Sequence, residues 1–212
     1  MKPGTRALGV AESYPGTARV PTVDHTDDAD FSTDPSEAGD SDARPESVLC
    51  GAVVRADRVV DGLAFETCTV GGDDATDAID SLYSSLGRED VRYLLVSGIA
   101  PAWFNLVDVN RLASDLDRPV LSVSFEDSEG LETALSTHFS GDALDRRLQI
   151  YRDAPPRTAV EVNDERVFVR AAGCDEAEAK QVVRAFTPTG GRPEPLRVAR
   201  MAARAGRQFV GD

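Results

Sequence analysis

Two predicted strands end in side chains that could take part in chemistry. The first covers Arg6–Ser13 (RALGVAES) and ends on Glu12 and Ser13, and another covers Val91–Ser97 (VRYLLVS) and ends on Ser97. In α/β proteins, ligands bind at the ends of such strands. A hydrolase would more usefully carry a carboxylate at the position of Ser97, so this serine needs an explanation.

Three carboxylates are candidates for a site, and each has a structural alternative. Glu12 is either a pocket carboxylate or a strand-end carboxylate that is solvated or paired with an arginine. Asp73 and Asp74 precede a helical pattern that runs to Leu86, and acids at this place cap a helix and complement its dipole. Capping is the interpretation that the sequence favours for both aspartates.

Two more polar residues follow the strand that ends at Ser97. Asn105 and Asp108 lie at the start of a helix predicted over residues 104–116. Asn105 either caps this helix or lines a pocket at the strand end. Asp108 is a further acidic candidate at the same place, so the candidate site extends from the strand ends onto this helix.

The last predicted helix, residues 194–208, carries a row of arginines. They are Arg197, Arg200, Arg204 and Arg207. Their spacing of three, four and three residues puts them on one helix face. This face is either a phosphate-binding stripe or a solvated face paired with acidic surface, and the composition favours the second interpretation. Arg197, together with Arg192 before the helix, is a candidate binding residue. The residues expected to pack are Val198, Met201, Ala202 and Ala205.

The elements that must position these residues alternate in type. Three antiparallel strands come first, then helix, strand, helix and strand, and last a second hairpin among further helices. Strands are predicted at residues 6–13, 48–54, 59–70, 91–97, 119–125, 158–162 and 167–171. Helices are predicted at residues 73–86, 104–116, 131–151 with a break near Gly141, 175–186 and 194–208. This order is typical of an α/β, ribonuclease H-like mixed sheet flanked by helices. Its first and fourth strands are neighbours, so Glu12 and Ser97 are expected to lie side by side.

The composition is that of a globular chain without an export or membrane signal. The chain has 212 residues, of which 41% are hydrophobic, enough for one domain with a sizeable core. No run approaches the ~20 apolar residues of a membrane span, and the N-terminus lacks the apolar segment of a signal peptide. A cytoplasmic protein without a membrane partner is therefore expected.

The charge is strongly acidic and unusual in its basic residues. The net charge is −14, and Lys2 and Lys180 are the only lysines among 23 basic residues. Acidic chains with few lysines are typical of a cytoplasm of very high salt, which predicts a halophilic source. Simple charge attraction to nucleic acid is weak for such a chain in such a medium.

Residues 15–46 differ from the rest of the chain. They are rich in Pro, Gly, Ser and Asp, and between Asp24 and Asp42 they hold eight acidic residues and no Lys or Arg. Such a segment cannot bury enough apolar surface to fold alone. It is predicted to be a disordered acidic insertion between the first two strands of a single domain spanning residues 1–212.

Several motifs occur together in the order of a known family. They are RALGVAES (6–13), VGGDDAT (70–76), FNLVD (104–108), ALSTHF (134–139) and RPEPLRVAR (192–200). The set resembles the archaeal domain-of-unknown-function family 99, which is related to endonuclease V and has a ribonuclease H-like fold. The resemblance covers nearly the whole chain apart from the insertion.

The resemblance implies a metal-dependent nuclease site, from which this sequence departs. In endonuclease V, strand-end carboxylates hold Mg²⁺ or Mn²⁺, which activates water for cutting beside deaminated bases. The family places aspartate at two strand positions that are Ala11 and Ser97 here, and Gly71 replaces a third, whereas Asp74 matches. A methyl group cannot ligate a metal, and a hydroxyl is a poor Mg²⁺ ligand. The Pro-Tyr-Ile-Pro wedge of endonuclease V is also absent from the sequence.

Three functions are compatible with these residues. The first is a catalytically degenerate relative that binds nucleic acid or a nucleotide; its binding residues would be Ser13, Asp73, Ser97, Asn105, Arg192 and Arg197. The second is an active Mg²⁺- or Mn²⁺-dependent endonuclease on deaminated nucleic acid with a relocated carboxylate set. In that case Glu12 and Asp74 would hold the metal, and Asp108 would join them as a catalytic residue. The third is a structural or regulatory module that binds another protein.

Overall fold

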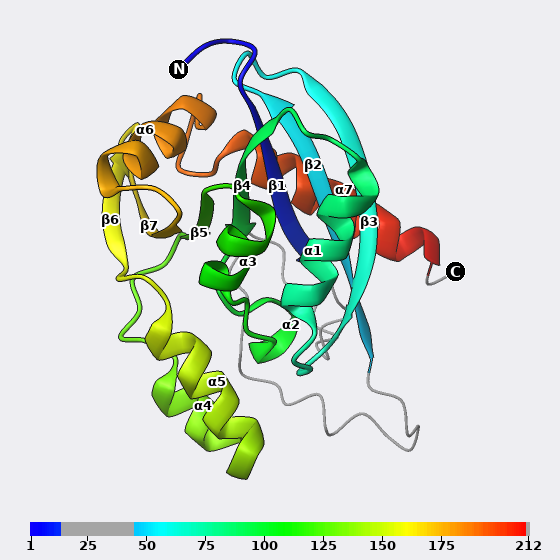
Figure 1. The fold of residues 1–212 in the computed structure, drawn as a ribbon, viewed down its shortest axis with the longest axis vertical. Coiled ribbons are helices and arrows are strands. Elements are labelled where there is room, and N and C mark those ends of the chain that lie inside the picture. Colours follow the sequence, from blue (N-terminus) through cyan, green and yellow to red (C-terminus); the bar gives the residue numbers. More distant parts are fainter. Residues whose placement is uncertain (14–44, 211–212) are drawn as a thin grey trace, which may run out of the picture.

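Seven strands form one mixed sheet in the computed structural model, which describes residues 1–13 and 45–210 (Figure 1). The strands are β1 (Arg6–Ser13), β2 (Glu46–Arg55), β3 (Val60–Thr69), β4 (Val91–Ser97), β5 (Val120–Ser124), β6 (Thr158–Val162) and β7 (Glu165–Ala172). Their spatial order is β3-β2-β1-β4-β5-β7-β6. β1 is antiparallel to β2 and parallel to β4, so the predicted mixed sheet with its first and fourth strands adjacent is confirmed.

Helices cover both faces of this sheet. They are α1 (Ala75–Leu86), α2 (Pro101–Phe104), α3 (Val109–Leu116), α4 (Glu132–His138), α5 (Gly141–Asp153), α6 (Glu176–Phe186) and α7 (Glu194–Val210). α1 and α3 pack on one face, called the α1 face below, and α6 and α7 pack on the other, the α7 face (Figure 1). The predicted break near Gly141 separates α4 from α5.

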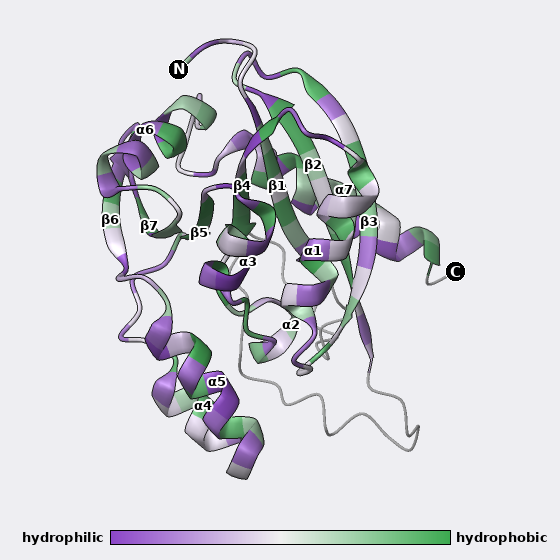
Figure 2. Ribbon diagram, viewed as in Figure 1, coloured by the Kyte–Doolittle hydropathy of each residue, from purple (hydrophilic) through white to green (hydrophobic). Residues whose placement is uncertain are grey.

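The strands are apolar because the helices bury them from both sides. In β1, Leu8 and Val10 belong to the core of the α1 face, whereas Ala7 and Ala11 belong to that of the α7 face. Figure 2 shows the resulting apolar colour along the central strands. Continuous apolar runs such as the one in β4 are typical of strands buried on both faces.

Small residues allow α7 to lie close to β1. A side chain on Gly9 would meet Pro195, since its Cβ would lie 2.3 Å from the Pro195 carbonyl carbon. The buried residues of α7 are Pro195, Leu196, Ala199 and Ala203. The sequence prediction placed Val198, Met201, Ala202 and Ala205 in the packed face. It is wrong for Met201, which is 56% exposed, and for Ala205, which is also exposed. Close approach at Gly9 selects the small side chains of α7 for the interface rather than its larger ones.

The helix predicted over residues 104–116 is interrupted. Its start belongs to the short turn α2, in which Ala102, Trp103 and Phe104 have positive φ angles of 46°, 53° and 59°. The chain is extended at Asn105 and Asp108, and α3 begins only at Val109. Three successive left-handed residues that are not glycine cost backbone energy, roughly 1–2 kcal/mol each, so tertiary contacts must hold them in place.

The predicted acidic insertion falls almost entirely outside the described residues. It covers residues 15–46, and the structure describes the chain again from residue 45. Glu46 is already the first residue of β2, so the end of the predicted insertion is corrected by one residue.

Candidate functional site at the ends of β1 and β4

Ala11 and Ser97 are neighbours on adjacent parallel strands. The register of β1 and β4 pairs Val10 with Val96, so the next residue of each strand, Ala11 and Ser97, comes beside the other. Both face the α7 side, because Val10 and Val96 lie in the core of the α1 face and strand side chains alternate. The two positions at which the family resemblance implies aspartate therefore meet at one point of the sheet.

Glu12 lies on the opposite face of the sheet from Ser97. One step along a strand turns a side chain to the other face, so the expectation that these two residues lie side by side is corrected by one position. Ala11 is packed against the small residues Ala52 and Ala199 beneath α7 and is only 4% exposed. No carboxylate of β1 therefore points toward Ser97.

Glu12 is largely buried beside β2 and α2. Ser47 donates a hydrogen bond from its Oγ to Glu12 Oε2 at 3.3 Å. Burial raises the pKa of Glu12, and the bond from Ser47, the charges of Arg200 and Arg204 and a backbone hydrogen bond at Ala102 offset only part of that rise. Glu12 is thus the strand-end carboxylate that is held closest to neutrality.

The raised pKa of Glu12 should contribute stability at acid pH that is lost as the pH rises, and Glu12→Gln should remove this contribution. Below the ordinary pKa of 4.5 both states of the chain carry a protonated Glu12. As pH rises through the higher folded-state pKa, ionisation costs more in the folded state than in the unfolded state, and stability is lost. The melting temperature of Glu12→Gln relative to wild type should therefore rise from pH 4 to pH 8. A pH-independent difference would contradict the raised pKa.

Asp74 is held by a network of hydrogen bonds at the end of β3. Its carboxylate accepts from Thr69 N at 3.1 Å, from Thr69 Oγ1 at 2.7 Å and from Asn105 Nδ2 at 2.5 Å. Burial alone would raise the pKa of Asp74, but the bonds from Thr69 and Asn105 outweigh it and lower the pKa. Asp74 occupies the N-cap position of α1, yet its side chain makes no capping bond.

The cap of α1 comes instead from Asn105, which is fully buried. Asn105 Oδ1 accepts from Ala75 N at 2.9 Å, and Asn105 Nδ2 also donates to Thr69 O at 2.8 Å. Neither interpretation of Asn105 from the sequence describes this role, because the cap joins residues 30 positions apart. The side chain is saturated by protein groups.

The other two aspartates also have structural partners. Asp108 caps α3, as its Oδ1 accepts from Arg111 N at 2.9 Å. Asp73 is exposed and forms an ion pair with Arg146 at 3.4 Å. Glu12 and Asp74 share Cys68 as a neighbour. The pKa of the Cys68 thiol is raised to about 12, mainly because the thiol is buried and further because of the negative charges of Asp74 and Glu12.

Arg147 fixes the left-handed turn α2 and was not found by sequence reasoning. It is 4% exposed, and its guanidinium donates to Phe104 O at 3.1 Å, to Gly71 O at 2.8 Å and to Gly72 O at 2.5 Å. It also lies 3.9 Å above the ring of Phe139. Arg147 thereby ties the loop before α1 to the turn after β4, the two segments that border Glu12 and Asp74.

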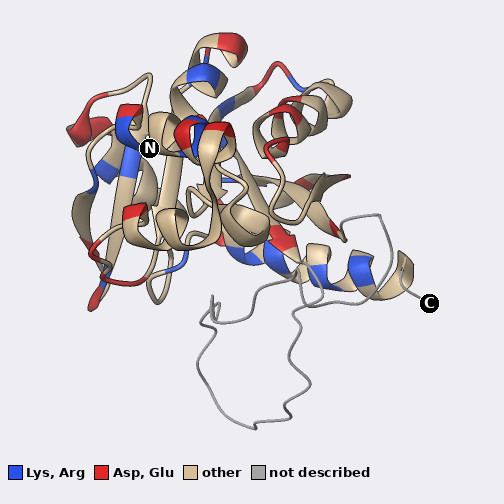
Figure 3. Ribbon diagram, turned by 90° about the horizontal axis from the view of Figure 1, so that it is seen from below, with Lys and Arg blue, Asp and Glu red and all other residues tan. Residues whose placement is uncertain are grey.

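The candidate arginines lie along α7 and before it. Arg197 forms a two-pronged ion pair with Glu194 at 2.6 and 2.7 Å, and Arg192 lies 3.9 Å above the ring of Phe125. Arg207 donates to Ser13 Oγ at 3.1 Å, which ties the end of α7 to the end of β1. Figure 3 shows the basic residues repeating along α7 toward the C-terminus. The row therefore runs beside the strand end that holds Glu12.

A two-metal nuclease centre does not fit these residues. The position between β1 and β4 offers a methyl group and a hydroxyl, and the retained Asp74 and Asp108 are engaged by backbone and side-chain donors. Within residues 1–13 and 45–210, no group of three or more His, Cys, Asp or Glu side chains could hold a metal ion. Hard cations need several such oxygen ligands together.

The fold is that of the endonuclease V proteins. Endonuclease V of Bacillus subtilis superposes with a TM-score of 0.58 and 12% identity, covering 98% of this chain and 82% of that one. Ciona intestinalis endonuclease V, solved in complex with a 24mer DNA containing an inosine followed by a ribo-adenosine, superposes with a TM-score of 0.57 and 12% identity. The match covers 97% of this chain and 87% of that one. A protein of unknown function from Archaeoglobus fulgidus superposes with a TM-score of 0.72 and 23% identity, and the match covers 94% of this chain and 96% of that one.

The chain belongs to the Endonuclease dU family, whose model matches residues 25–206. A UPF0215 protein of Thermococcus kodakarensis is 36% identical over 162 residues, which are 76% of this chain and 81% of the relative. A UPF0215 protein of Pyrobaculum aerophilum is 34% identical over 165 residues, which are 77% and 88%. These relatives are archaeal. Within the described part of the chain, no helix is both long and apolar enough to span a bilayer.

Proposed function

We propose that this protein is a catalytically degenerate member of its family that binds nucleic acid without cutting it. The observation that carries the proposal is the pair Ala11 and Ser97, which stand side by side where the family resemblance implies metal-binding aspartates. Two of the remaining carboxylates have structural roles. Asp74 accepts hydrogen bonds from Thr69 and Asn105, and Asp108 caps α3.

A nucleic-acid partner is supported by the fold neighbours and by α7. The Ciona intestinalis endonuclease V was solved with inosine-containing DNA, and the family description names an endonuclease and dU. In this chain the arginine row of α7 lies next to the end of β1, and Arg204 is exposed within it. Because the net charge is −14, binding depends on this local positive row rather than on the whole surface.

Arg204→Gln should weaken binding of fluorescent duplex DNA similarly for all sequences. Loss of one phosphate contact lowers the slope of log K against log salt by about 0.9 for duplex DNA. Anisotropy titrations from low to molar KCl measure both quantities. The matched control is Arg152→Gln on α5, an equally large charge change at an exposed arginine that pairs with Glu132. Equal affinities for the two variants would contradict a role of α7 in binding.

The alternative is an active endonuclease, as the name of the family suggests. The resemblance to endonuclease V implies Mg²⁺ or Mn²⁺ as its metal. Its metal would bind between Glu12 and Asp74, whose charges both reach Cys68. It requires Asp74 to exchange its bonds to Thr69 and Asn105 for a metal. Cleavage of deoxyuridine- or inosine-containing DNA that Glu12→Gln abolishes would favour this alternative over the degenerate protein.

The proposed cellular setting is a cytoplasm of high salt. The 37 acidic residues and the near absence of lysine are the features that support it. We also propose that the protein is a member of the archaeal family 99 that it resembles. In this proposal the chain forms one domain, and residues 15–46 are an acidic insertion in it. Binding measured in molar KCl as well as at low salt therefore tests the protein under the conditions for which its composition is suited.

A further inference from the structure

Exposed apolar side chains gather at one edge of the molecule. Within the described residues, Leu63 is 47% exposed and Phe65 51% on β3, and Phe209 is 86% exposed on α7. Val60 of β3 and Met201 and Val210 of α7 are further large exposed hydrophobics, and the exposed Val59 directly precedes β3. Gly206 of α7 lies against Phe65, since a Cβ there would be 2.9 Å from the ring. Leu63 and Phe65 of β3 therefore lie beside the end of α7 that carries Phe209, and these three side chains are called the β3 patch.

β3 is an end strand of the described sheet, and one of its edges has no neighbouring strand there. Edge strands of monomeric proteins are usually protected by lysine, proline or short length. β3 spans ten residues, VDGLAFETCT, without lysine or proline, and its pairing with β2 is irregular only at Asp61 near the start of the strand. α7 continues past this edge toward the C-terminus, as Figure 1 shows. The strand and the helix end together offer backbone groups and apolar surface to a partner.

We propose that a second copy of this chain covers the β3 patch, with the two β3 strands antiparallel about a two-fold axis at Ala64. This register places Leu63 of each copy opposite Phe65 of the other, on the α7 face of the joined sheet. The projecting end of each α7 then lies over the seam, where Phe209 covers these pairs. The result is an isologous dimer whose sheet continues from one copy into the other.

Charge complementarity selects this register and this occupant. Pairing about Ala64 sets Glu66 of one copy opposite Gly62 of the other. Arg88 stands beside Gly62, with its Nη1 3.9 Å from the position of a Gly62 Cβ. It already forms ion pairs with Asp61 at 3.1 Å and with Asp90 at 2.8 Å, so Glu66 of the second copy would extend an existing network of charges. A shift of the axis by one residue sets Glu66 opposite Val60 or Ala64 and loses this approach to arginine. Because of the two-fold symmetry, Glu66 of each copy approaches Arg88 of the other, a favourable contact in a chain whose net charge is −14.

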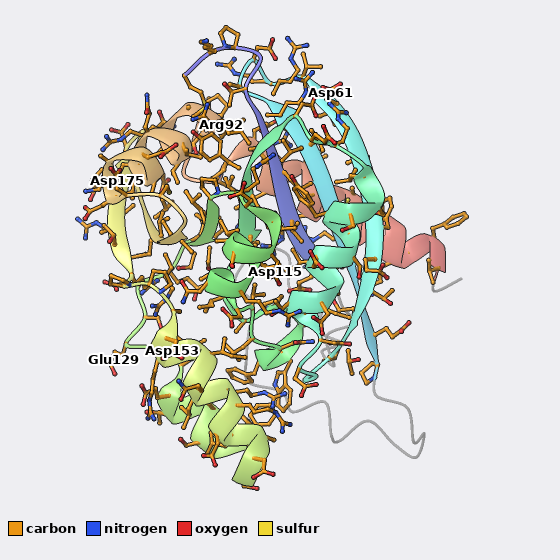
Figure 4. All side chains as sticks on the ribbon, viewed as in Figure 1. Asp61, Arg92, Asp115, Glu129, Asp153 and Asp175 are labelled. Atoms are coloured by element: carbon orange, nitrogen blue, oxygen red, sulfur yellow. The ribbon has the colours of Figure 1, made fainter. Side chains whose placement is uncertain are left out.

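The dimer is tested by sedimentation equilibrium of the full chain in molar KCl, where surface repulsion is screened. Twice the chain mass at micromolar concentration is expected, and Phe65→Ser and Glu66→Arg should each raise the dissociation constant at least tenfold. Glu129→Arg, the same charge change in a loop far from β3 (Figure 4), should leave it unchanged. A monomeric wild type, or a dimer that neither β3 variant weakens, would overturn the proposal and assign the patch to another partner.

The register is tested by cysteine cross-linking. Two Ala64→Cys side chains would face each other across the axis, within the Cα separation of about 4.4–6.8 Å that a disulfide needs. Mild oxidation should therefore cross-link Ala64→Cys but not Thr67→Cys, an exposed position of the same strand that meets Asp61 of the second copy instead. Equal cross-linking of both variants, or cross-linking of Thr67→Cys alone, would refute the proposed register even if the protein is dimeric.

Discussion

Replacing Ala11 and Ser97 together by aspartate is expected to create a divalent-metal site at a place where the wild type has a methyl group and a hydroxyl. The two positions are adjacent on β1 and β4 and share one face of the sheet. Two aspartates there would repel each other strongly without a cation, because Ala11 is only 4% exposed. Mn²⁺ or Mg²⁺ would relieve this repulsion, so metal binding and stability become linked.

The expected size of the effect is large enough for two independent measurements. At a free metal concentration of one hundred times the dissociation constant, binding to the folded state adds about 2.7 kcal/mol. For a chain of this size that is a rise in melting temperature of roughly 5–10 °C over the EDTA value. Titration calorimetry should show micromolar binding to the double variant and none to wild type. Ser97→Asp alone is a less disruptive variant for the same measurements, because Ser97 is only half-buried. A folded double variant without metal binding would contradict the assignment of these positions.

Replacing Arg147 by methionine is expected to be among the most destabilising single changes in the chain. The substitution keeps most of the apolar stem but leaves the carbonyls of Phe104, Gly71 and Gly72 without their charged donor. Buried acceptors that lose a charged partner cost roughly 1.5–3 kcal/mol each before relaxation, so a loss of ~3–5 kcal/mol is expected. The released turn α2 should then give up its left-handed backbone.

The adjacent residue provides the control for this change. The side chain of Arg146 is 59% exposed and forms a solvent-exposed ion pair with Asp73. Arg146→Met should therefore change the free energy of unfolding by less than about 0.5 kcal/mol. Urea unfolding of both variants in the same high-salt buffer measures the difference. Equal unfolding midpoints would show that Arg147 does not hold the turn.

The sequence predicts the sheet well because its strands are buried on both faces. The boundaries of β1 and β4 agree with the pattern, and the neighbouring placement of the two strands follows from the order of elements. The register does not follow from that order. Ala11 and not Glu12 lies beside Ser97, and a bulge near Arg6 and Ala7 shifts the pairing of these strands. Such irregularities depend on tertiary packing, which periodicity does not record.

The candidate site is predictable in its residues but not in their roles. The sequence identifies Asp74, Asn105 and Asp108. Asp74 and Asn105 are engaged by each other across a distance that only the fold closes, whereas Asp108 makes a local cap with Arg111 N. Asn105 caps a helix 30 residues away, and Arg147 binds carbonyls more than 40 residues away. The apolar segment around Trp103 looks helical, and its left-handed backbone depends on contacts that local propensity cannot reveal.

The most direct test of catalytic degeneracy is a cleavage assay on labelled DNA that contains one deoxyuridine or inosine. The wild-type protein is incubated with it in Mn²⁺ or Mg²⁺ at low and molar KCl, and binding and product are measured on the same sample. Bound, intact DNA is the predicted result, because Ala11 and Ser97 stand side by side where the family resemblance implies metal-binding aspartates. Metal-dependent cutting beside the modified base, lost in Glu12→Gln, would contradict it.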